Sequence, residues 1–167
     1  VTGVQTCALP ISGEAVRVQA SGKTFTKMRF DQEAGHQRTI HIPEHVDVIA
    51  DMACGAQAHF LISSIAGLSG PNEVYLFGSN GVLRFSGGAL QGAQRGDDRL
   101  SDIDIPSDLQ GGWRVEEEFV KAIRGEEVIK LTTFADGVRY MAFTEAVAES
   151  IATGAAVPLQ PLRHTAM

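Results

Sequence analysis

The sequence predicts an α+β fold, an open and mostly antiparallel sheet with two C-terminal helices packed on one face. Three observations predict it. Short segments with period-two alternation follow one another between residues 15 and 94, and an Asn-Gly pair joins two of them. Helical periodicity begins only after residue 112. Strand-rich and helix-rich parts that are separate along the chain are typical of α+β proteins.

The composition is that of one globular domain. The chain has 167 residues, of which 44% are hydrophobic and 20% charged, enough to bury a core. A net charge of -6 argues against nucleic acid as a partner, since such proteins present basic surfaces. No apolar run approaches the roughly 18 residues that span a bilayer, so no membrane partner is expected. Two cysteines give neither a disulfide framework nor a zinc spacing, and a cytoplasmic location is predicted.

Three strands are predicted in the first third of the chain. Residues 15–20 alternate apolar and polar side chains, which is typical of a half-buried strand. Residues 21–38 are polar and irregular and predict a connection, and residues 39–42 alternate again before Pro43 ends the pattern. The next strand carries four apolar residues on one face: Val46, Val48, Ala50 and Met52.

Four more strands are expected before the helices. Residues 56–65 carry an apolar face of Ala58, Phe60 and Ile62. Residues 72–77 and 82–85 flank Gly78-Ser79-Asn80-Gly81, whose Asn-Gly pair is a strong hairpin signal. Residues 90–94 add another strand, and residues 96–112 predict a loop. The sheet is therefore expected to have about six to eight strands and one covered face.

Two helices are predicted after this loop. In the first, Val115, Phe119 and Ile123 belong to one apolar stripe, and residues 116–118 are three glutamates in the first turns, where the helix dipole favours anions. They are interpreted as a solvated turn rather than as acid–base groups. The second helix starts at Thr133, with Asp136 completing a capping box, and stops at Gly154.

The second helix is apolar over most of its circumference, so it requires cover on more than one side. The sheet covers one side, and a missing domain or a subunit partner is expected on the other. Glu145 interrupts the apolar run, and three readings are open: exposure beside Glu149, an ion pair with an arginine, or a domain-interface contact. The first is favoured.

The first residues do not resemble a biological motif. Residues 1–11, VTGVQTCALPI, read as the in-frame translation of a short-read sequencing-library adapter, with Ser12 at the junction. A secretory signal would need a basic region before its apolar stretch, and this segment has no charge. Residues 1–12 are therefore expected to be an artefact, which removes Cys7 and implies a gene cut upstream of Gly13.

The remaining sequence resembles a known family of oxidoreductases. Residues 13–20 read GEAVRVQA, residues 113–125 WRVEEEFVKAIRG, residues 134–141 FADGVRYM, residues 145–154 EAVAESIATG and residues 157–159 VPL. In this order and spacing they resemble the C-terminal domain of the Gfo/Idh/MocA family, named for glucose-fructose oxidoreductase and inositol dehydrogenase. The resemblance divides the chain into residues 1–12, a domain at 13–160 that carries substrate-pocket walls and an oligomer interface, and a tail at 161–167.

The resemblance implies that half of the parent protein is missing. The family's N-terminal Rossmann domain binds NAD or NADP and carries a proton-transfer lysine, and an Asp/His pair precedes the strand that matches residues 15–20. No residue here matches that catalytic motif, so no catalytic, cofactor-binding or metal residue is predicted, and the fragment is expected to be inactive alone. The parent would oxidise a sugar, inositol or related polyol and would form a homo-oligomer through the sheet face.

Three residues are candidates for contact with a small carbohydrate-like substrate. His59, Tyr75 and Trp113 are of types that bind hydroxyls or stack on sugars, although core or interface roles compete for each. His41 and His45 have a metal-pair spacing that Pro43 argues against. Cys54 is interpreted as a small buried hydrophobe. The alternative to a dehydrogenase half is a non-catalytic ligand-binding or assembly module of the same fold.

Overall fold

A computed structural model describes residues 13–129 and 133–159. The adapter-like residues 1–12 with Cys7, and the predicted tail at 161–167, lie outside the described residues. The chain forms two compact units. Unit 1 comprises residues up to 66 and from 118 onward, and unit 2 comprises residues 67–117. Antiparallel sheets and two C-terminal helices confirm the α+β class, but the strands form three sheets rather than one.

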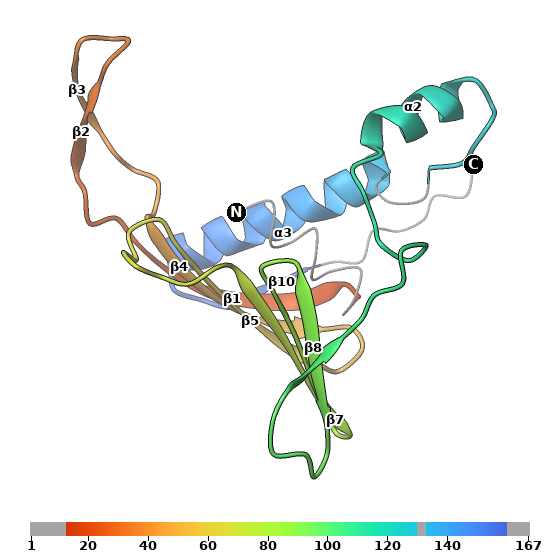
Figure 1. The fold of residues 1–167 in the computed structure, drawn as a ribbon. Helices are drawn as coiled ribbons and strands as arrows, with labels where there is room; N and C mark the ends of the chain where they lie inside the picture. The colour runs from red at the N-terminus through yellow and green to blue at the C-terminus, as the bar shows by residue number, and fades with distance from the viewer. Residues whose placement is uncertain (1–12, 130–132, 160–167) are drawn as a thin grey trace. The chain divides into compact units, whose positions relative to one another are not determined.

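The main sheet of unit 1 has four strands. Its order is β10 (Val157–Pro158), β1 (Ala15–Lys23), β4 (His45–Met52) and β5 (Gln57–Ser63), and the pairs whose register is known are antiparallel (Figure 1). Strands β1, β4 and β5 confirm three of the predicted strands. Strand β10 is the short segment after the second helix, and it completes the β1 edge of the sheet.

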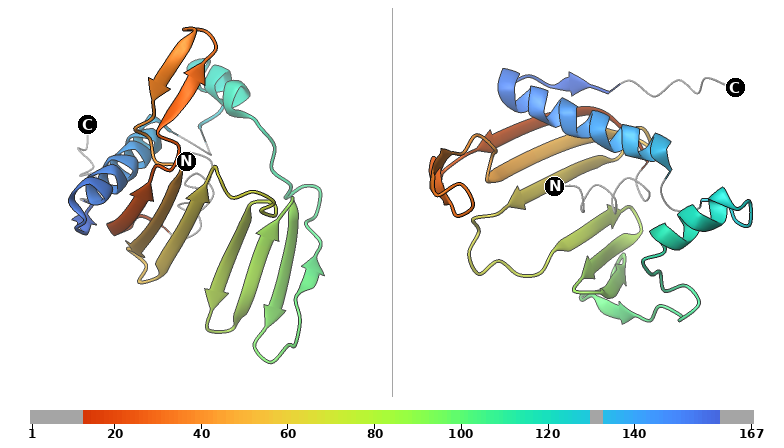
Figure 2. Two further views of the ribbon diagram at one scale, coloured as in Figure 1. Left: turned by 90° about the vertical axis from the view of Figure 1, so that its left-hand side faces the viewer. Right: turned by 90° about the horizontal axis from the view of Figure 1, so that it is seen from above.

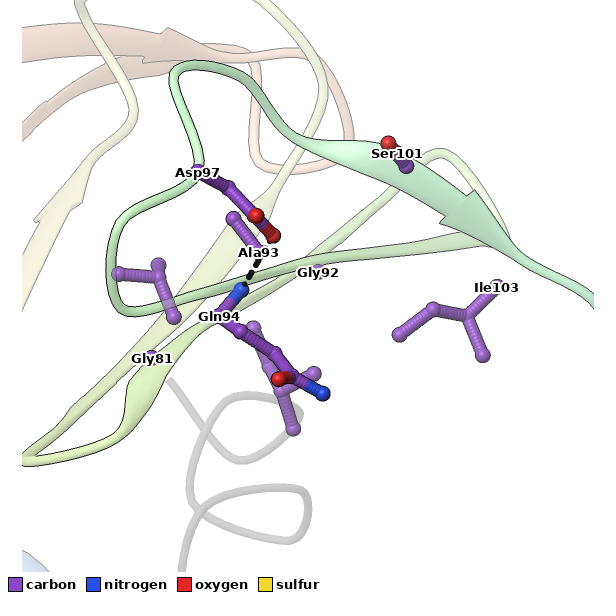
Figure 3. Close-up of a pocket in the computed structure, with 9 residues that line it drawn as sticks. Gly81, Gly92, Ala93, Gln94, Asp97, Ser101 and Ile103 are labelled. Atoms are coloured by element: carbon purple, nitrogen blue, oxygen red, sulfur yellow. Dashed lines mark hydrogen bonds between the residues drawn. The ribbon is translucent and has the colours of Figure 1, made fainter.

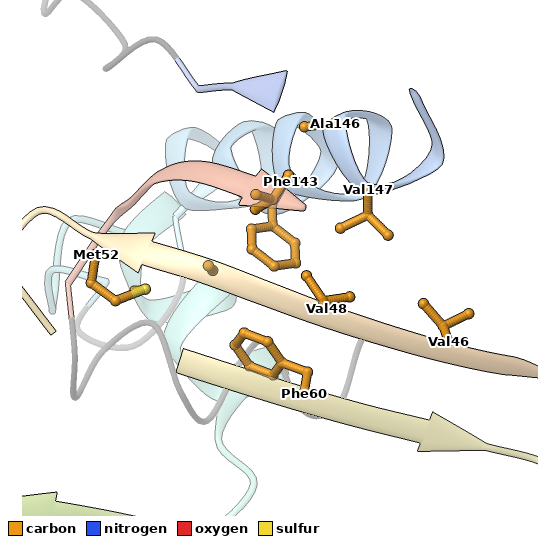
Figure 4. Close-up of a cluster of buried hydrophobic side chains, with 9 residues drawn as sticks. Val46, Val48, Met52, Phe60, Phe143, Ala146 and Val147 are labelled. Carbon is orange, nitrogen blue, oxygen red and sulfur yellow. The ribbon is translucent and has the colours of Figure 1, made fainter. Parts of the chain in front are cut away.

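Helix α3 (Phe134–Thr153) packs against one face of this sheet, as expected for the second helix. The alternation of β4 and β5 aims Val48 and Phe60 at the helix, where Phe60 meets Phe143 edge to face at 5.8 Å (Figure 4). Each such buried side chain contributes about 1.5–3 kcal/mol. The core consists of Val18, Val46, Val48, Ala50, Met52, Phe60, Phe143, Ala146 and Val147.

Two residues allow β1 and α3 to approach closely. Gly22 faces the end of the helix, and a Cβ there would lie 2.9 Å from Ile151 Cδ1. Ser150 is fully buried, and its hydroxyl accepts a hydrogen bond from the Ala20 amide at 2.8 Å and donates to the Ala155 carbonyl at 2.7 Å. The hydroxyl therefore ties the strand, the helix and the segment leading to β10 together.

Both ends of α3 are as predicted. Thr133 and Asp136 form a reciprocal capping box, and Gly154 ends the helix in the left-handed region at φ 71°. The helix is apolar on several sides, and Phe134, Val138 and Met141 remain exposed on its first turns. Glu145 is exposed together with Glu149, in agreement with the favoured reading of that carboxylate.

A hairpin arm between β1 and β4 was not predicted. Residues 21–38 were expected to be irregular and residues 39–42 a strand, but the structure has β2 (Met28–Asp31) paired with β3 (His36–Thr39). The arm extends beyond the ends of β1 and β4 (Figure 1). Because it lies on no other sheet, its alternation is not reflected in burial, and the apolar side chains of Met28 and Phe30 are exposed.

Glu44 anchors this arm. Its side chain is buried, and its carboxylate accepts hydrogen bonds from the amides of Phe25 at 2.9 Å and Thr26 at 2.7 Å and forms an ion pair with Arg29. These contacts, led by the Thr26 amide, lower the pKa of Glu44 from its ordinary 4.5 to about 2. The base of the arm is therefore built around one ionised carboxylate.

Unit 2 is built on a second antiparallel sheet, in the order β6 (Glu73–Gly78), β7 (Gly81–Ser86), β8 (Ala89–Gln94) and β9 (Ser101–Ile103) (Figure 2). Strands β6 and β7 pair up to Gly78 and Gly81, so the predicted hairpin forms, with Ser79-Asn80 rather than the Asn-Gly pair as its two turn residues. The first three strands confirm the prediction. Strand β9 lies inside the segment expected to be a loop and is only three residues long.

Helix α2 (Val115–Ile123) and Cys54 correct three expectations. The apolar stripe of α2 is largely exposed at Val115, Phe119 and Ile123. Glu118, expected in a solvated turn, is buried instead. Cys54, expected to be buried, is exposed, because it lies in the turn between β4 and β5 beside Gly55 rather than in either strand.

Candidate substrate-contact surfaces

His59 lies on the face of the unit 1 sheet opposite α3. Strand alternation places it there because Phe60 points into the core. Its side chain is 62% exposed, and its Nε2 lies 3.6 Å from Asp47 Oδ1. His45 Nε2 lies 2.9 Å from the other oxygen, Asp47 Oδ2. Two imidazoles therefore flank one carboxylate on an open surface.

The rest of this open face mixes ion pairs with apolar side chains. Arg17 Nε donates to Asp51 Oδ2 at 2.8 Å, and this hydrogen bond, with one from Gln57, lowers the pKa of Asp51. Ile49 and Leu61, on neighbouring strands, are exposed beside these polar groups. Such a mixture of polar and exposed apolar side chains occurs at protein interfaces and in open binding surfaces.

Tyr75 lies on one face of the unit 2 sheet with an aromatic neighbour. The rings of Tyr75 and Phe77 are parallel within 2°, with centroids 5.6 Å apart. The guanidinium carbon of Arg84, directly across from Tyr75 on β7, lies 5.8 Å from the Tyr75 centroid. Phe77 is 78% exposed.

A row of polar side chains continues from Arg84 across this face. Arg84 forms an ion pair with Glu73, which lowers the pKa of Glu73, and Arg84 Nη1 donates to Gln91 Oε1 at 3.0 Å. Gln91 Nε2 in turn donates to Asp102 Oδ1 at 2.8 Å. The row therefore crosses all four strands and holds its donors and acceptors in fixed positions.

A shallow pocket of about 460 Å³ lies along β7, β8 and β9, and its lining includes residues from both faces of the sheet (Figure 3). Leu83, Gly92 and Ile103 form much of its wall, and Asp97 accepts a hydrogen bond from the Gln94 amide at its rim. A Cβ on Gly92 would lie 2.7 Å from Ile103 Cδ1, so a larger residue here would displace the Ile103 side chain. The pocket offers few polar groups to orient a hydroxylated ligand.

Trp113 lies just before α2 and is 80% exposed. A hydrogen bond from its side chain is the main cause of a lowered pKa at Glu116, in the first turn of the helix. The indole is therefore oriented by a partner while most of its ring surface stays accessible.

The three candidate residues are divided between the units. Tyr75 and Trp113 belong to unit 2 and His59 to unit 1, so the structure does not assign them to one site. The neighbours of Tyr75, Phe77 and Arg84, and the residues linked to Arg84, Gln91 and Asp102, were not predicted from the sequence. Only the alternation of β6 signals Phe77, because the other partners reach this face through strand pairing.

The described residues contain neither a metal-ion cluster nor a phosphate loop. Within residues 13–129 and 133–159, no group of three or more His, Cys, Asp or Glu side chains is placed to hold a metal ion. The glycine-dense segments at 78–81 and 87–89 are turns between antiparallel strands, as predicted, and neither leads into a helix as a phosphate loop does. Neither helix of the described part of the chain has the length and apolar character needed to span a bilayer.

Comparison with known sequences gives no assignment. No protein-family model matches the chain, and no curated protein matches it. Comparison of folds, by contrast, gives many matches among solved structures.

Several of the similar structures are oxidoreductases. The apo form of a levoglucosan dehydrogenase matches with a TM-score of 0.78 and 21% identity, over 96% of this chain and 50% of that one. The same enzyme in complex with NADH and L-sorbose matches with a TM-score of 0.76 and 22% identity, over 96% of this chain and 49% of that one. An NAD binding oxidoreductase from Klebsiella pneumoniae matches with a TM-score of 0.75 and 19% identity, over 96% of this chain and 49% of that one. The chain therefore has the fold of about half of each of these oxidoreductases and spans only about half their length.

Proposed function

We propose that this chain is the C-terminal half of an NAD(P)-dependent oxidoreductase of the Gfo/Idh/MocA type that acts on a sugar, inositol or related polyol. The observation that carries the proposal is the asymmetry of coverage: 96% of this chain matches 50% of a levoglucosan dehydrogenase. The resemblance of residues 113–125, 134–141 and 145–154 to the family also supports it.

In this proposal the missing Rossmann domain holds the cofactor and supplies the catalytic groups. The described residues offer no strand-to-helix glycine loop for a pyrophosphate, so they do not fit a dinucleotide site, and no hydride-transfer step is assigned to them. The chain alone is accordingly expected to be inactive. It would supply substrate-pocket walls and an oligomer interface to the complete protein.

His59, Tyr75 and Trp113 remain our candidates for substrate contact, and the surroundings of Tyr75 and His59 favour different roles for them. The exposed Tyr75 and its fixed polar neighbours favour a ligand-binding role. The exposed Ile49 and Leu61 near His59 favour the proposed homo-oligomer interface on the open face of unit 1. We also propose a cytoplasmic location, which the composition supports.

The test begins with a long sequencing read across the junction at Ser12 in the source DNA. We expect a dinucleotide loop, a Lys-Pro segment and an Asp/His helix in frame with Gly13. The joined gene would then be expressed, and NAD(P) reduction measured with a panel of sugars and cyclic polyols, with the proton-transfer lysine replaced as control. A start codon just upstream, or an unrelated domain there, would exclude the enzyme and leave a binding or assembly module.

A further inference from the structure

The Tyr75 side of the unit 2 sheet is here called the Tyr75 face. Strand register arranges its side chains in rows of different size and polarity. One cross-strand row runs from Phe77 to Val82 and Ala93. The next row runs from Tyr75 to Arg84, Gln91 and Asp102. Residues two apart on a strand share a face, so the two rows lie side by side.

The small side chains of the first row make a floor. Val82 and Ala93 are half-buried, whereas Phe77 at the end of the same row is 78% exposed. From Phe77 to Ala93 the row crosses two strand spacings, about 10 Å. Phe77 thus borders a low apolar floor at its β6 end, and the polar row runs along one side of it.

The polar row keeps hydrogen-bonding capacity free at the edge of this floor. Gln91 uses one amide hydrogen on Asp102 Oδ1 and its carbonyl on Arg84. An amide nitrogen has a second hydrogen, and a carboxylate has a second oxygen. A donor and an acceptor therefore lie next to each other, an arrangement that fits two neighbouring hydroxyls of one ligand.

The charges on this face favour a neutral ligand over an anion. Arg84 is already paired with Glu73, and Ser86 Oγ also donates to Glu73 at 3.3 Å. Asp102 adds a carboxylate to the row. A phosphate or other anion would therefore meet Arg84, whose charge is already paired with Glu73, and would be repelled by the Asp102 carboxylate.

We propose that the Tyr75 face binds the ring of a neutral sugar or cyclic polyol, packed against Phe77 over the Val82 and Ala93 floor, with two hydroxyls bound by Gln91 and Asp102. The C–H side of such a ring is apolar and slightly positive and fits the negative face of an aromatic ring. The choice of ligand class rests on the proposed function, which this assignment deepens.

The test is saturation-transfer-difference NMR on the 167-residue chain, with D-glucose, myo-inositol and levoglucosan as probes. Irradiation of the aromatic protons should transfer saturation to the ring C–H protons of at least one probe. Phe77→Ala should weaken binding about three- to tenfold. Gln91→Ala should weaken probe binding by a similar factor. The probe that still binds this variant should receive saturation at the same ring C–H protons, because Phe77 is unchanged.

Phe85→Ala is the matched control. Phe85 pairs with Val74 on the opposite face of the same sheet and is 45% exposed, so its loss should leave binding unchanged. Circular dichroism of each variant confirms that the sheet has formed. Absence of transfer to every probe, or equal weakening by Phe85→Ala, would overturn the proposal.

A second copy of the chain is the competing occupant of the Tyr75 face, and sedimentation velocity separates the two. Dissociation of an oligomer by Phe77→Ala, but not by Phe85→Ala, would overturn the sugar site in favour of an interface. The outcome is also separable from the proposed function. Binding here needs no nucleotide domain, and a parent with proven dehydrogenase activity but an empty Tyr75 face would refute this assignment alone.

Discussion

At the scale of single residues, Ser150 links β1, α3 and the segment leading to β10. Its hydroxyl satisfies an amide of β1 and a carbonyl after α3, both where water is excluded. A valine or alanine would fill much of the same volume but leave both backbone groups without a partner.

Ser150→Ala is therefore expected to lower the free energy of unfolding by about 1–3 kcal/mol. Urea denaturation followed by circular dichroism measures the change. Thr153→Ala, an exposed hydroxyl on the same helix that donates to the Glu149 carbonyl, is the control and should change stability by less than about 0.5 kcal/mol. Equal effects of the two substitutions would contradict the linking role.

Glu44 makes the stability of the hairpin arm depend on pH, and the lowered pKa of Glu44 sets the direction of that dependence. A carboxyl with a folded pKa of about 2 and an ordinary value of 4.5 stabilises the folded arm above pH 4.5. That contribution is lost as pH falls from 4.5 through 2. Hydrogen exchange at the Phe25 and Thr26 amides should therefore accelerate over this window relative to exchange in the α3 core.

Glu44→Gln provides the reference for this experiment. The variant cannot ionise, so its Phe25 and Thr26 amides should exchange faster than those of the parent chain above pH 4.5. The difference between the two proteins should vanish as pH approaches 2. A difference that stays constant from pH 7 to pH 2 would show that the carboxylate charge does not hold the arm.

At the scale of elements, one glycine inside α3 and one at its C-cap have opposite requirements. Gly154 ends the helix at φ 71°, a conformation that costs an L-residue roughly 1–2 kcal/mol. Gly137 lies inside the helix, and a Cβ there would meet nothing within 4 Å. The same substitution at the two positions should thus have opposite effects.

Gly154→Ala should lower the free energy of unfolding by about 1 kcal/mol, and Gly137→Ala should raise it by about 0.5–1 kcal/mol. Thermal unfolding of both variants, compared with the parent chain, tests the pair. A loss of stability in both variants would mean that Gly137 is retained for a contact beyond the described residues.

At the scale of the whole molecule, exposed apolar side chains on α3 make self-association the expected behaviour of the isolated chain. Phe134, Val138 and Met141 are exposed on the first turns of a helix whose later turns are buried against the sheet. Uncovered apolar patches of this kind drive association.

The isolated chain should sediment as species larger than its 17.8 kDa monomer and should bind an apolar dye. The double variant Phe134→Ser and Met141→Ser should reduce both signals. Ile42→Ser, which removes an equally exposed apolar side chain elsewhere in unit 1, should not. A monomeric parent chain without dye binding would contradict the prediction.

The sequence predicted those elements whose local pattern and burial agree. Strands β1, β4 and β5 have one covered face, so apolar and polar residues alternate along their sequences. The capping box of α3 and the Asn-Gly pair near the β6–β7 turn are signals carried by a few neighbouring residues. The arm was missed because both of its faces are open and no burial follows its alternation. Cys54 was misplaced because a turn, rather than a strand, holds it.

The candidate site was predictable only in part, for a related reason. Tyr75 was identified by residue type, and a residue type carries no information on neighbours. Arg84, Gln91 and Asp102 join it through the register of β6 to β9, which is set by tertiary pairing. The burial of Glu118 likewise depends on contacts that helical periodicity does not encode.

The position of β10 also sets an order of events during synthesis. Strand β1 pairs with β4 soon after it is made, but its other edge waits for Val157 and Pro158 at the far end of the described chain. The hairpins of unit 2, which pair neighbours in sequence, can close while the ribosome is still translating. A nascent chain arrested before residue 157 therefore carries an open strand edge along Arg17 and Val18, which remains available for pairing with other chains until β10 has been made.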